Sequence, residues 1–223
     1  MVNVCVPVLK RYDLLRKMVM SLERSTLPAQ VLVINNGGMP DSVLRQAMVF
    51  WDVPFDVYTP PTPLGVAASW NYFLKIVPEE RVIVNDDIIF VPTSLERLLA
   101  SKADLVWAKG CGFSCFVLRD SCIAKLGLFD EEISPGYAYY EDDDYLQRLD
   151  GHRTREPSAV AMEVECGVIH EVSGTLKVNT PAEMEEHHRK FKIAQGNYVR
   201  KWGLEEAFER ERVQREMLAQ GGR

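Results

Sequence analysis

The chain has 223 residues, a formal net charge of −6, 47% hydrophobic residues and 26% charged ones. This length and composition fit one large globular domain, or one domain with an appendage, and the acidic balance argues against a generally basic nucleic-acid surface. No apolar run approaches the ~18–20 residues that a transmembrane helix needs, and the N-terminus lacks the pattern of a signal peptide. The sequence therefore predicts a soluble cytoplasmic protein with no transmembrane segment.

The five cysteines contain no C-x-x-C pair, which indicates neither a disulfide framework nor a zinc site. We expect them to be reduced and mostly buried.

Strand and helix patterns alternate over the first ~100 residues, which is typical of an α/β fold. Short apolar, β-branched runs predict buried strands at 2–8, 31–34, 55–58 and 81–84. Apolar residues at helical spacing predict helices at 14–22, 41–48 and 65–77. Sheets of this kind bind ligands at the carboxyl ends of their strands. Three of the four predicted strands end near candidate ligand-binding residues, at Pro7, Asn36 and Asp87.

The rest of the chain divides into further α/β elements and a charged helical end. The patterns predict a strand at 104–108, a glycine-bearing turn followed by another strand within 110–118, helices after Pro92 and from Asp120 to Gly127, and one late strand over 160–169. From residue 180 onward they predict two helices, at 181–201 and 204–218. We therefore expect an α/β domain at 1–175 and a C-terminal helical appendage at 176–223, suited to packing on the sheet, covering the site or forming a homodimer.

Four consecutive carboxylates, Glu141 to Asp144, follow a loop that contains glycine and proline. Four like charges in a row are costly unless a cation is held nearby. The alternative is a solvated helix start, because acidic side chains favour the first turn through the helix dipole.

Two further features could bind a metal ion. Asp86 and Asp87 end an apolar strand, where a carboxylate is well placed to hold Mg²⁺ or Mn²⁺ against a diphosphate. The alternative is that these residues close a turn or cap a helix. His170 ends the late strand and could be another ligand, although a lone histidine is also often a partly buried residue with ordinary hydrogen bonds.

Taken in order, these segments resemble the family-2 glycosyltransferases of the GT-A fold. The resemblance covers about residues 2–175, and a Lys-Trp-Gly tail at 201–203 also looks like the family's. The matching stretches are Val4–Pro7, Val31–Gly37, Leu64–Asn71, Val82–Asp87, Gly127–Glu131 and Glu141–Leu149. The resemblance implies a Rossmann-like mixed sheet flanked by helices.

The resemblance also implies roles for individual residues. Pro7 and Asn36 would lie against the base and ribose of a nucleotide, and Gly65 and Asn71 would shape the donor pocket. Asp86 would contact the ribose or sugar. The first position of the family's Asp-x-Asp motif is Asn85 here, so an amide replaces one anionic contact.

The remaining implied roles concern the metal and the chemistry. Asp87 would bind Mn²⁺ or Mg²⁺ bridging the diphosphate, and His170 would complete the metal site. Asp142 would be the general base that takes the proton from the acceptor hydroxyl, with Glu141 orienting it or contacting the acceptor. The order of the motif favours Asp142 for this role, with Asp143 and Asp144 as the alternatives. Base catalysis then gives in-line attack with inversion at the anomeric carbon.

The implied function is transfer of a sugar from a UDP- or GDP-linked donor to a hydroxyl acceptor. The acceptor would be a saccharide or lipid-linked sugar, or a hydroxymethylated base in viral DNA. A basic set on the late helix could contact DNA phosphates, although a solvated helix face is the favoured interpretation. That set comprises Arg189, Lys190, Lys192, Arg200 and Lys201.

Two other function classes stay open. A sugar-phosphate nucleotidyltransferase would share the architecture, but the chain has no Gly-rich, Arg/Lys-bearing phosphate loop after the first strand. A non-catalytic module that binds nucleotides or sugars would share the fold without turnover.

Overall fold

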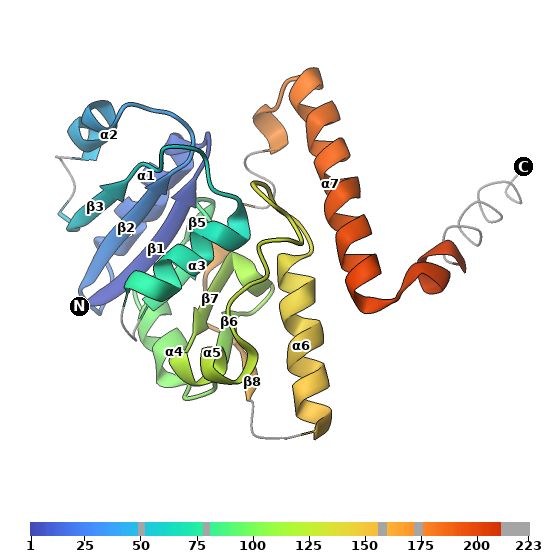
Figure 1. Cartoon of the computed structure of the whole chain (residues 1–223). Helices are drawn as coiled ribbons and strands as arrows, with labels where there is room; N and C mark the ends of the chain where they lie inside the picture. The colour runs from blue at the N-terminus through green and yellow to red at the C-terminus, as the bar shows by residue number, and fades with distance from the viewer. Residues whose placement is uncertain (49–51, 78–80, 156–159, 172–175, 211–223) are drawn as a thin grey trace, which may run out of the picture.

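The computed structural model describes residues 1–48, 52–77, 81–155, 160–171 and 176–210. Its centre is a seven-stranded sheet in the order β3-β2-β1-β4-β7-β6-β8 (Figure 1). Strands β3, β2, β1 and β4 are parallel, whereas β7 runs antiparallel to both of its neighbours. The strands are β1 Val2–Val8, β2 Ala29–Asn35, β3 Phe55–Tyr58, β4 Arg81–Val84, β6 Leu105–Ala108, β7 Cys115–Leu118 and β8 Ala161–Val164. The predicted α/β class with a mixed sheet is confirmed.

Helices cover both faces of the sheet (Figure 1). The α-helices are α1 Tyr12–Leu22, α2 Asp41–Met48, α3 Val66–Ile76, α4 Ser94–Ala100, α5 Asp120–Leu126, α6 Glu141–Arg155 and α7 Pro181–Trp202, and the 3₁₀ turns are η1 Gly112–Ser114 and η2 Leu176–Val178. Apolar residues of α1 and α4 pack in one core, while Trp70 of α3, Cys122 of α5 and Tyr145 of α6 pack in another. Each core buries the apolar stripe of an amphipathic helix, which is the main source of stability for such helices.

The late strand expected over 160–169 is wrong as a single element. It is two short strands, β8 in the main sheet and β9 Ile169–His170, which pairs antiparallel with β5 Ile88–Ile89. Gly167 lies between them at φ 74°, a left-handed conformation that glycine adopts at little cost. The chain leaves the main sheet there and returns beside the end of β4.

Helix α7 confirms the helix predicted over 181–201. It begins with a capping box, in which the Thr180 hydroxyl accepts from the Glu183 amide and the Glu183 carboxylate accepts from the Thr180 amide, and it ends at Gly203 in the left-handed conformation. A small separate core of Ile133, Tyr198 and Val199 joins α7 to the rest of the molecule.

The end of the chain is described only to residue 210, and residues 205–210 are helical. The rest of the second predicted helix, and residue 175 at the predicted domain boundary, lie outside the described residues. Among the helices described, none combines the length and the apolar character needed to cross a membrane.

Candidate functional site

The carboxyl end of β4 carries the two aspartates singled out in the sequence. Asp86 and Asp87 are both buried, at 7% and 6% exposure. The β5–β9 pairing places Ile88 opposite His170, and the Glu171 amide donates to the Asp87 carbonyl at 2.9 Å. The structure therefore brings together Asp87 and His170, whose Oδ1 and Nε2 atoms are 3.3 Å apart.

The donor atoms at this edge fit a divalent cation that takes part of its coordination from a substrate. An imidazole nitrogen and a carboxylate oxygen lie side by side, and hard cations such as Mg²⁺ are commonly held by one or two carboxylates together with phosphate oxygens. Within the described ranges, no group of three or more His, Cys, Asp or Glu side chains forms a complete metal cage. The arrangement therefore suits a metal site whose coordination is completed by a substrate better than a purely structural metal site.

Asp86 has an unusual electrostatic environment. Its burial, reinforced by the adjacent Asp87 carboxylate, raises the pKa of Asp86 to about 7, and the guanidinium of Arg11 opposes this shift. The sequence analysis did not identify Arg11, which follows β1 in the chain. Arg11 donates two hydrogen bonds, of 2.8 and 2.7 Å, to the Asp13 carboxylate. The position of Arg11 shortly after the first strand is the feature of the sequence that could have indicated its role.

Three of the predicted nucleotide-sugar-binding residues lie near the end of β1, directly after β2 and directly before α3, whereas Asn71 lies within α3 and Asn85 and Asp86 follow β4. Pro7 is paired with Ile34 in the sheet. The buried Asn36 side chain donates to the Ser69 hydroxyl at 3.2 Å and accepts from the Leu64 amide at 2.8 Å. These bonds orient Asn36 and tie β2 to the segment that leads into α3.

Gly65 permits a close backbone approach. A Cβ atom at this position would lie 2.7 Å from both the backbone nitrogen and the backbone oxygen of Tyr137. The Val66 amide donates to the Tyr137 carbonyl at 2.8 Å. The loop that leads into α6 is therefore held against the N-terminus of α3, beside the predicted donor residues.

Two further residues predicted to bind the nucleotide sugar have side chains that form hydrogen bonds within the protein. The Asn71 amide donates to the Phe129 carbonyl and to Glu131, and its oxygen accepts from the Phe129 amide. The Asn85 amide donates to the Ser114 hydroxyl at 3.1 Å. In this arrangement Asn71 shapes the site by holding the stretch after Gly127 in place.

The four acidic residues at the start of α6 have four different environments. Glu141 and Asp144 are buried, at 4% and 0% exposure, whereas Asp143 is exposed and Asp142 is intermediate. Burial, together with the charge of Asp142, raises the pKa of Glu141 to about 8, while the Ser134 hydroxyl donates to it at 3.1 Å. Asp142 accepts a hydrogen bond from the Asp143 amide at 3.0 Å.

Asp144 is the member of this run that a cation holds. It accepts from Arg148 Nε at 3.0 Å and from Trp202 Nε1 at 3.0 Å, and Lys201 Nζ lies 2.6 Å away. Lys201 also contacts Asp130 at 2.7 Å. Sequence reasoning missed this network, although the Lys-Trp-Gly tail that supplies two of its members had been noted. The run does start a helix, but not a solvated one, because Glu141 and Asp144 are buried, and the expected cation pairing is found at Asp144.

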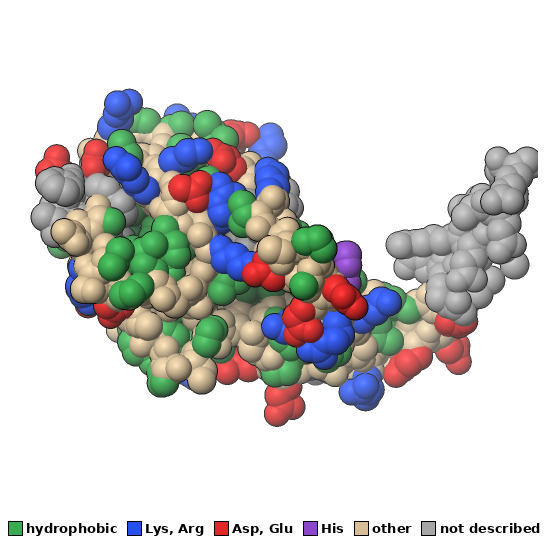
Figure 2. Space-filling view, turned by 90° about the horizontal axis from the view of Figure 1, so that it is seen from above, with side chains coloured by type: hydrophobic (Ala, Val, Ile, Leu, Met, Phe, Trp, Pro, Cys, Tyr) green, Lys and Arg blue, Asp and Glu red, His purple; other side chains and the backbone are tan. Residues whose placement is uncertain are grey.

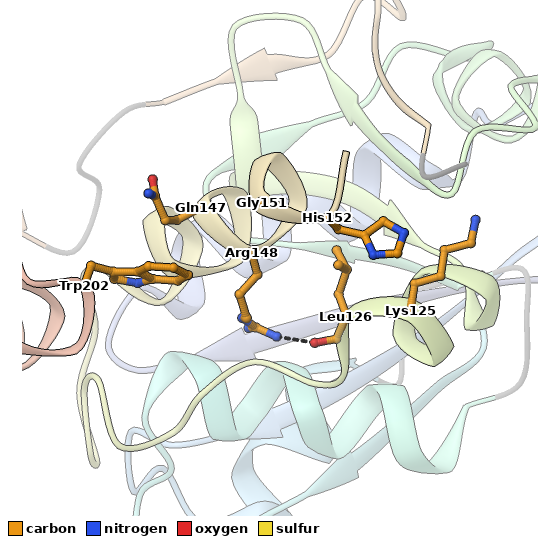
Figure 3. Close-up of a pocket in the computed structure, with 7 residues that line it drawn as sticks. All are labelled: Lys125, Leu126, Gln147, Arg148, Gly151, His152 and Trp202. Atoms are coloured by element: carbon orange, nitrogen blue, oxygen red, sulfur yellow. Dashed lines mark hydrogen bonds between the residues drawn. The ribbon is translucent and has the colours of Figure 1, made fainter. Parts of the chain in front are cut away.

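A pocket of about 400 Å³ lies elsewhere, beside the later turns of α6. Figure 3 shows Trp202 on one side of α6 and the end of α5 on the other. The lining residues are Lys125, Leu126, Gln147, Arg148, Gly151, His152 and Trp202. None of the predicted site residues lines it, so this pocket is distinct from the edge of the sheet that carries Asp87.

The charged side chains on the face of the molecule seen from above are of mixed sign. Figure 2, which views the molecule from above, shows Lys and Arg interspersed with Asp and Glu rather than gathered into one patch. On α7, Arg189 and Lys190 both pair with Glu186, and Lys201 pairs with Asp130 and Asp144. Three of the five residues proposed to contact DNA are thus already ion-paired within the protein.

Comparisons with known proteins concern the fold. No protein-family model matches the sequence, and no curated protein matches it. A crystal structure of S. aureus TarS 1-349 is similar with a TM-score of 0.53 at 14% identity, over 66% of this chain and 55% of that one. GalNAc-T7, in a structure with UDP, GalNAc and Mn²⁺, is similar with a TM-score of 0.59 at 9% identity, over 85% of this chain and 48% of that one.

A third similar structure is glucosyl-3-phosphoglycerate synthase from Mycobacterium tuberculosis in complex with phosphoglyceric acid. It has a TM-score of 0.57 at 13% identity, over 91% of this chain and 80% of that one. The chain spans about half the length of the TarS and GalNAc-T7 structures that it matches. At these identities the likeness shows the fold, and the chain has the GT-A-type fold that the resemblance implied.

Proposed function

We propose that this chain is a family-2-type glycosyltransferase that moves a sugar from a nucleoside-diphosphate sugar to a hydroxyl acceptor with inversion. The observation that carries the proposal is the pairing of Asp87 with His170, 3.3 Å apart at the carboxyl edge of a GT-A-type sheet. Two residues separated by more than eighty positions in the chain meet there through a dedicated two-stranded pairing. GalNAc-T7, one of the similar structures, contains UDP, GalNAc and Mn²⁺, which are ligands that fit such an enzyme.

In this proposal Asp87 and His170 hold Mn²⁺ or Mg²⁺. The bound cation would offset the negative charge that develops on the departing nucleoside diphosphate. Asp86, Asn85 and Pro7 border the same edge, and Asn36, Gly65 and Asn71 set the shape of the donor side. Contacts to the base decide whether the nucleotide is UDP or GDP, and a thermal-shift screen of both kinds of donor identifies the nucleotide.

Asp142 acts as the general base. Its carboxylate takes the proton from the acceptor hydroxyl, the acceptor oxygen forms the new bond to the anomeric carbon, and the bond from that carbon to the diphosphate breaks. Asp142 suits this role because it is partly accessible, while Asp144 is fully buried and ion-paired and Asp143 is exposed. The buried Glu141 beside it holds a proton near neutral pH and therefore adds less repulsion to the Asp142 carboxylate.

The proposed acceptor is a saccharide or lipid-linked sugar. A modified DNA base is the weaker alternative, because internal ion pairs already occupy Arg189, Lys190 and Lys201. The cytoplasmic location and a homodimer through the C-terminal helices stay predictions.

A thermal-shift screen tests the proposal directly. The full chain is heated with a panel of nucleoside-diphosphate sugars, with and without Mn²⁺, because a ligand that binds the folded state raises the melting temperature. We expect one nucleotide class to raise it, with a larger rise when Mn²⁺ is present. No shift with any nucleotide would contradict the proposal.

Turnover separates the remaining classes of function. The radiolabelled donor selected by the screen is incubated with the protein and with candidate hydroxyl acceptors, and transfer of the labelled sugar is the expected result. Binding without transfer or hydrolysis would indicate a non-catalytic module. Formation of the nucleotide sugar from a sugar phosphate and a nucleoside triphosphate would indicate a nucleotidyltransferase.

A further inference from the structure

The turn directly before the proposed base has a strained backbone. Tyr139 and Tyr140 have φ angles of 93° and 67°, the non-glycine residues in the described ranges with positive φ. Side chains with a Cβ atom adopt this region at a cost in free energy, and such residues persist only where their surroundings hold them in place. The question is what holds this turn.

Helix α7 supplies the surroundings of both tyrosines. The Tyr139 ring packs edge-on against His187 and Phe191, and its hydroxyl lies 3.2 Å from His187 Nε2. Tyr140 stacks on Tyr198, with ring centroids 5.2 Å apart. In Figure 1, α7 rises beside α6 and the loop that leads into it.

One hydrogen bond makes this contact specific. Gln195 Nε2 donates to the Tyr140 hydroxyl at 2.8 Å, which joins the middle of α7 to the second strained residue. An aromatic contact tolerates sliding, whereas a hydrogen bond of this length specifies a position.

The strained turn is joined directly to the first turn of α6. The Asp144 amide donates to the Tyr140 carbonyl at 2.9 Å, and Glu141 and Asp142 lie within the loop that this bond closes. The Asp144 carboxylate is in turn held by Lys201 and Trp202 at the end of α7. Helix α7 therefore contacts the segment that carries Asp142 at two points, at Tyr140 before Asp142 and at Asp144 after it.

We propose that α7 is a positioning element of the active site, which holds the Tyr139–Tyr140 turn in its strained conformation and thereby sets the position of the Asp142 carboxylate. Gln195 is its main positioning residue. The inference rests on the proposed function for the role of Asp142, but the hold of α7 on the turn is a separate physical claim. In this proposal α7 contributes to the geometry of the active site and is not a separate appendage.

The test removes the Gln195–Tyr140 hydrogen bond from either side. Tyr140→Phe deletes the hydroxyl and keeps the ring, and Gln195→Leu deletes the donor and keeps a similar volume. Glu185→Gln is the matched control, because Glu185 is an exposed residue of the same helix. The double variant is made as well, since two changes that remove one shared interaction are not additive.

Hydrogen–deuterium exchange gives a readout that needs no activity. We expect faster uptake by the amides of residues 137–146 in Tyr140→Phe, in Gln195→Leu and equally in the double variant, with strands β1 and β4 unchanged. Glu185→Gln should exchange like the unmodified chain. Unchanged uptake in the two single variants would overturn the proposal that α7 holds the turn.

Kinetics test the consequence for the site. At saturating donor, kcat should fall by about 10- to 100-fold in each single variant, since a small displacement of a catalytic group has effects of that size, while the KM for the donor and the melting temperature stay the same. An unchanged kcat with a loosened turn would overturn the positioning role. If the unmodified chain turns over no nucleoside-diphosphate sugar, the proposed function fails, and the exchange experiment alone decides whether α7 holds the turn.

Discussion

The two acidic regions of this molecule, the end of β4 and the start of α6, handle their charge in different ways. At the end of β4, Asp86 and Asp87 are both buried, and the histidine beside Asp87 arrives from the distant strand β9. At the start of α6 the charge is divided among residues with separate environments. Glu141 is buried with a raised pKa, Asp142 is partly accessible, and Asp144 is neutralised by cations.

The difference shows why a run of acidic residues in a sequence does not by itself indicate the function of each residue. Asp143 and Asp144 are adjacent and chemically identical, yet one is exposed and the other meets Arg148, Lys201 and Trp202. One full helical turn holds 3.6 residues, so four successive residues point in four directions, and each meets a different part of the fold. Asp86 and Asp87 instead lie in the short turn between β4 and β5, where both are buried and Asp87 meets His170.

The largest effect is expected at Asp142. Asp142→Asn removes the proposed base while keeping the shape, and transfer should fall by about 10²- to 10⁴-fold, the range that general base catalysis contributes. Donor binding should change little, since the base contacts the acceptor. Initial rates with the labelled donor and thermal shifts with the same donor measure the two effects.

Asp143→Asn is the control for this substitution, because it removes one charge from an exposed neighbour in the same turn. It should retain most of the transfer rate. Equal losses in the two variants would mean that the run acts through its total charge, and undiminished turnover in Asp142→Asn would exclude Asp142 as the base.

The next effect concerns stability and sharpens the contrast within α6. Asp144→Asn would leave Arg148 and Lys201 facing an amide in a buried position, and breaking a buried ion pair in this way typically costs about 3–5 kcal/mol. We expect a cost toward the lower end, because Lys201 is 32% exposed. Asp143→Asn should change the free energy of unfolding by at most about 0.5 kcal/mol, as exposed substitutions usually do. Urea unfolding of the two variants measures the difference, and equal stability would contradict the structural role of Asp144.

A third substitution probes the strand end. Asp87→Asn should weaken the Mn²⁺-dependent binding of the donor, and each tenfold loss of affinity removes about 1.4 kcal/mol of ligand-induced stabilisation. His170→Ala should act in the same direction. Glu171→Gln is the matched control, because that carboxylate pairs at the surface with Lys17 at 3.3 Å. The thermal-shift measurement with and without Mn²⁺ decides the outcome, and an Asp87→Asn variant that keeps its full Mn²⁺ response would remove Asp87 from the metal site.

Most of the fold could be predicted from the sequence because its signals are local. The continuous apolar run Val31–Ile34 and the helical period of apolar residues in α1 are signals of this kind, and both elements lie where the pattern predicts. Strands β5 and β9 were missed because two residues carry no periodicity, and their pairing depends on where Gly167 turns the chain. Short elements of this kind are specified by tertiary contacts rather than by propensity.

The site shows the same division between local and distant information. The sequence marks Asp87, His170 and Asp142 by their chemistry and their order in the chain. It does not reveal that Trp202 and Lys201 reach Asp144 across 58 and 57 positions, since a salt bridge between distant segments leaves no pattern along the chain. The left-handed turn at Tyr139 and Tyr140 was hidden for a further reason, because tyrosine is an unusual residue for that conformation.

The last expected effect is a change in how stability depends on pH. Burial, and then the charge of Asp142, raise the pKa of Glu141 from its ordinary 4.5 to about 8 in the folded chain. Between these two values the folded protein binds more protons at Glu141 than the unfolded chain does, so the free energy of unfolding falls as the pH rises through this interval. Glu141→Gln removes that titration and keeps an acceptor for the Ser134 hydroxyl.

The decline in stability between about pH 5 and pH 8 should therefore be shallower in Glu141→Gln than in the unmodified chain. Part of the decline should persist, because the pKa of Asp86 is also raised, to about 7. Glu132→Gln is the control, since Glu132 is exposed on the loop before α6. Urea unfolding at several pH values measures the slopes. Parallel curves for Glu141→Gln and the unmodified chain would mean that Glu141 is ionised in the folded protein, and the strand end would then be the region that keeps a proton near neutral pH.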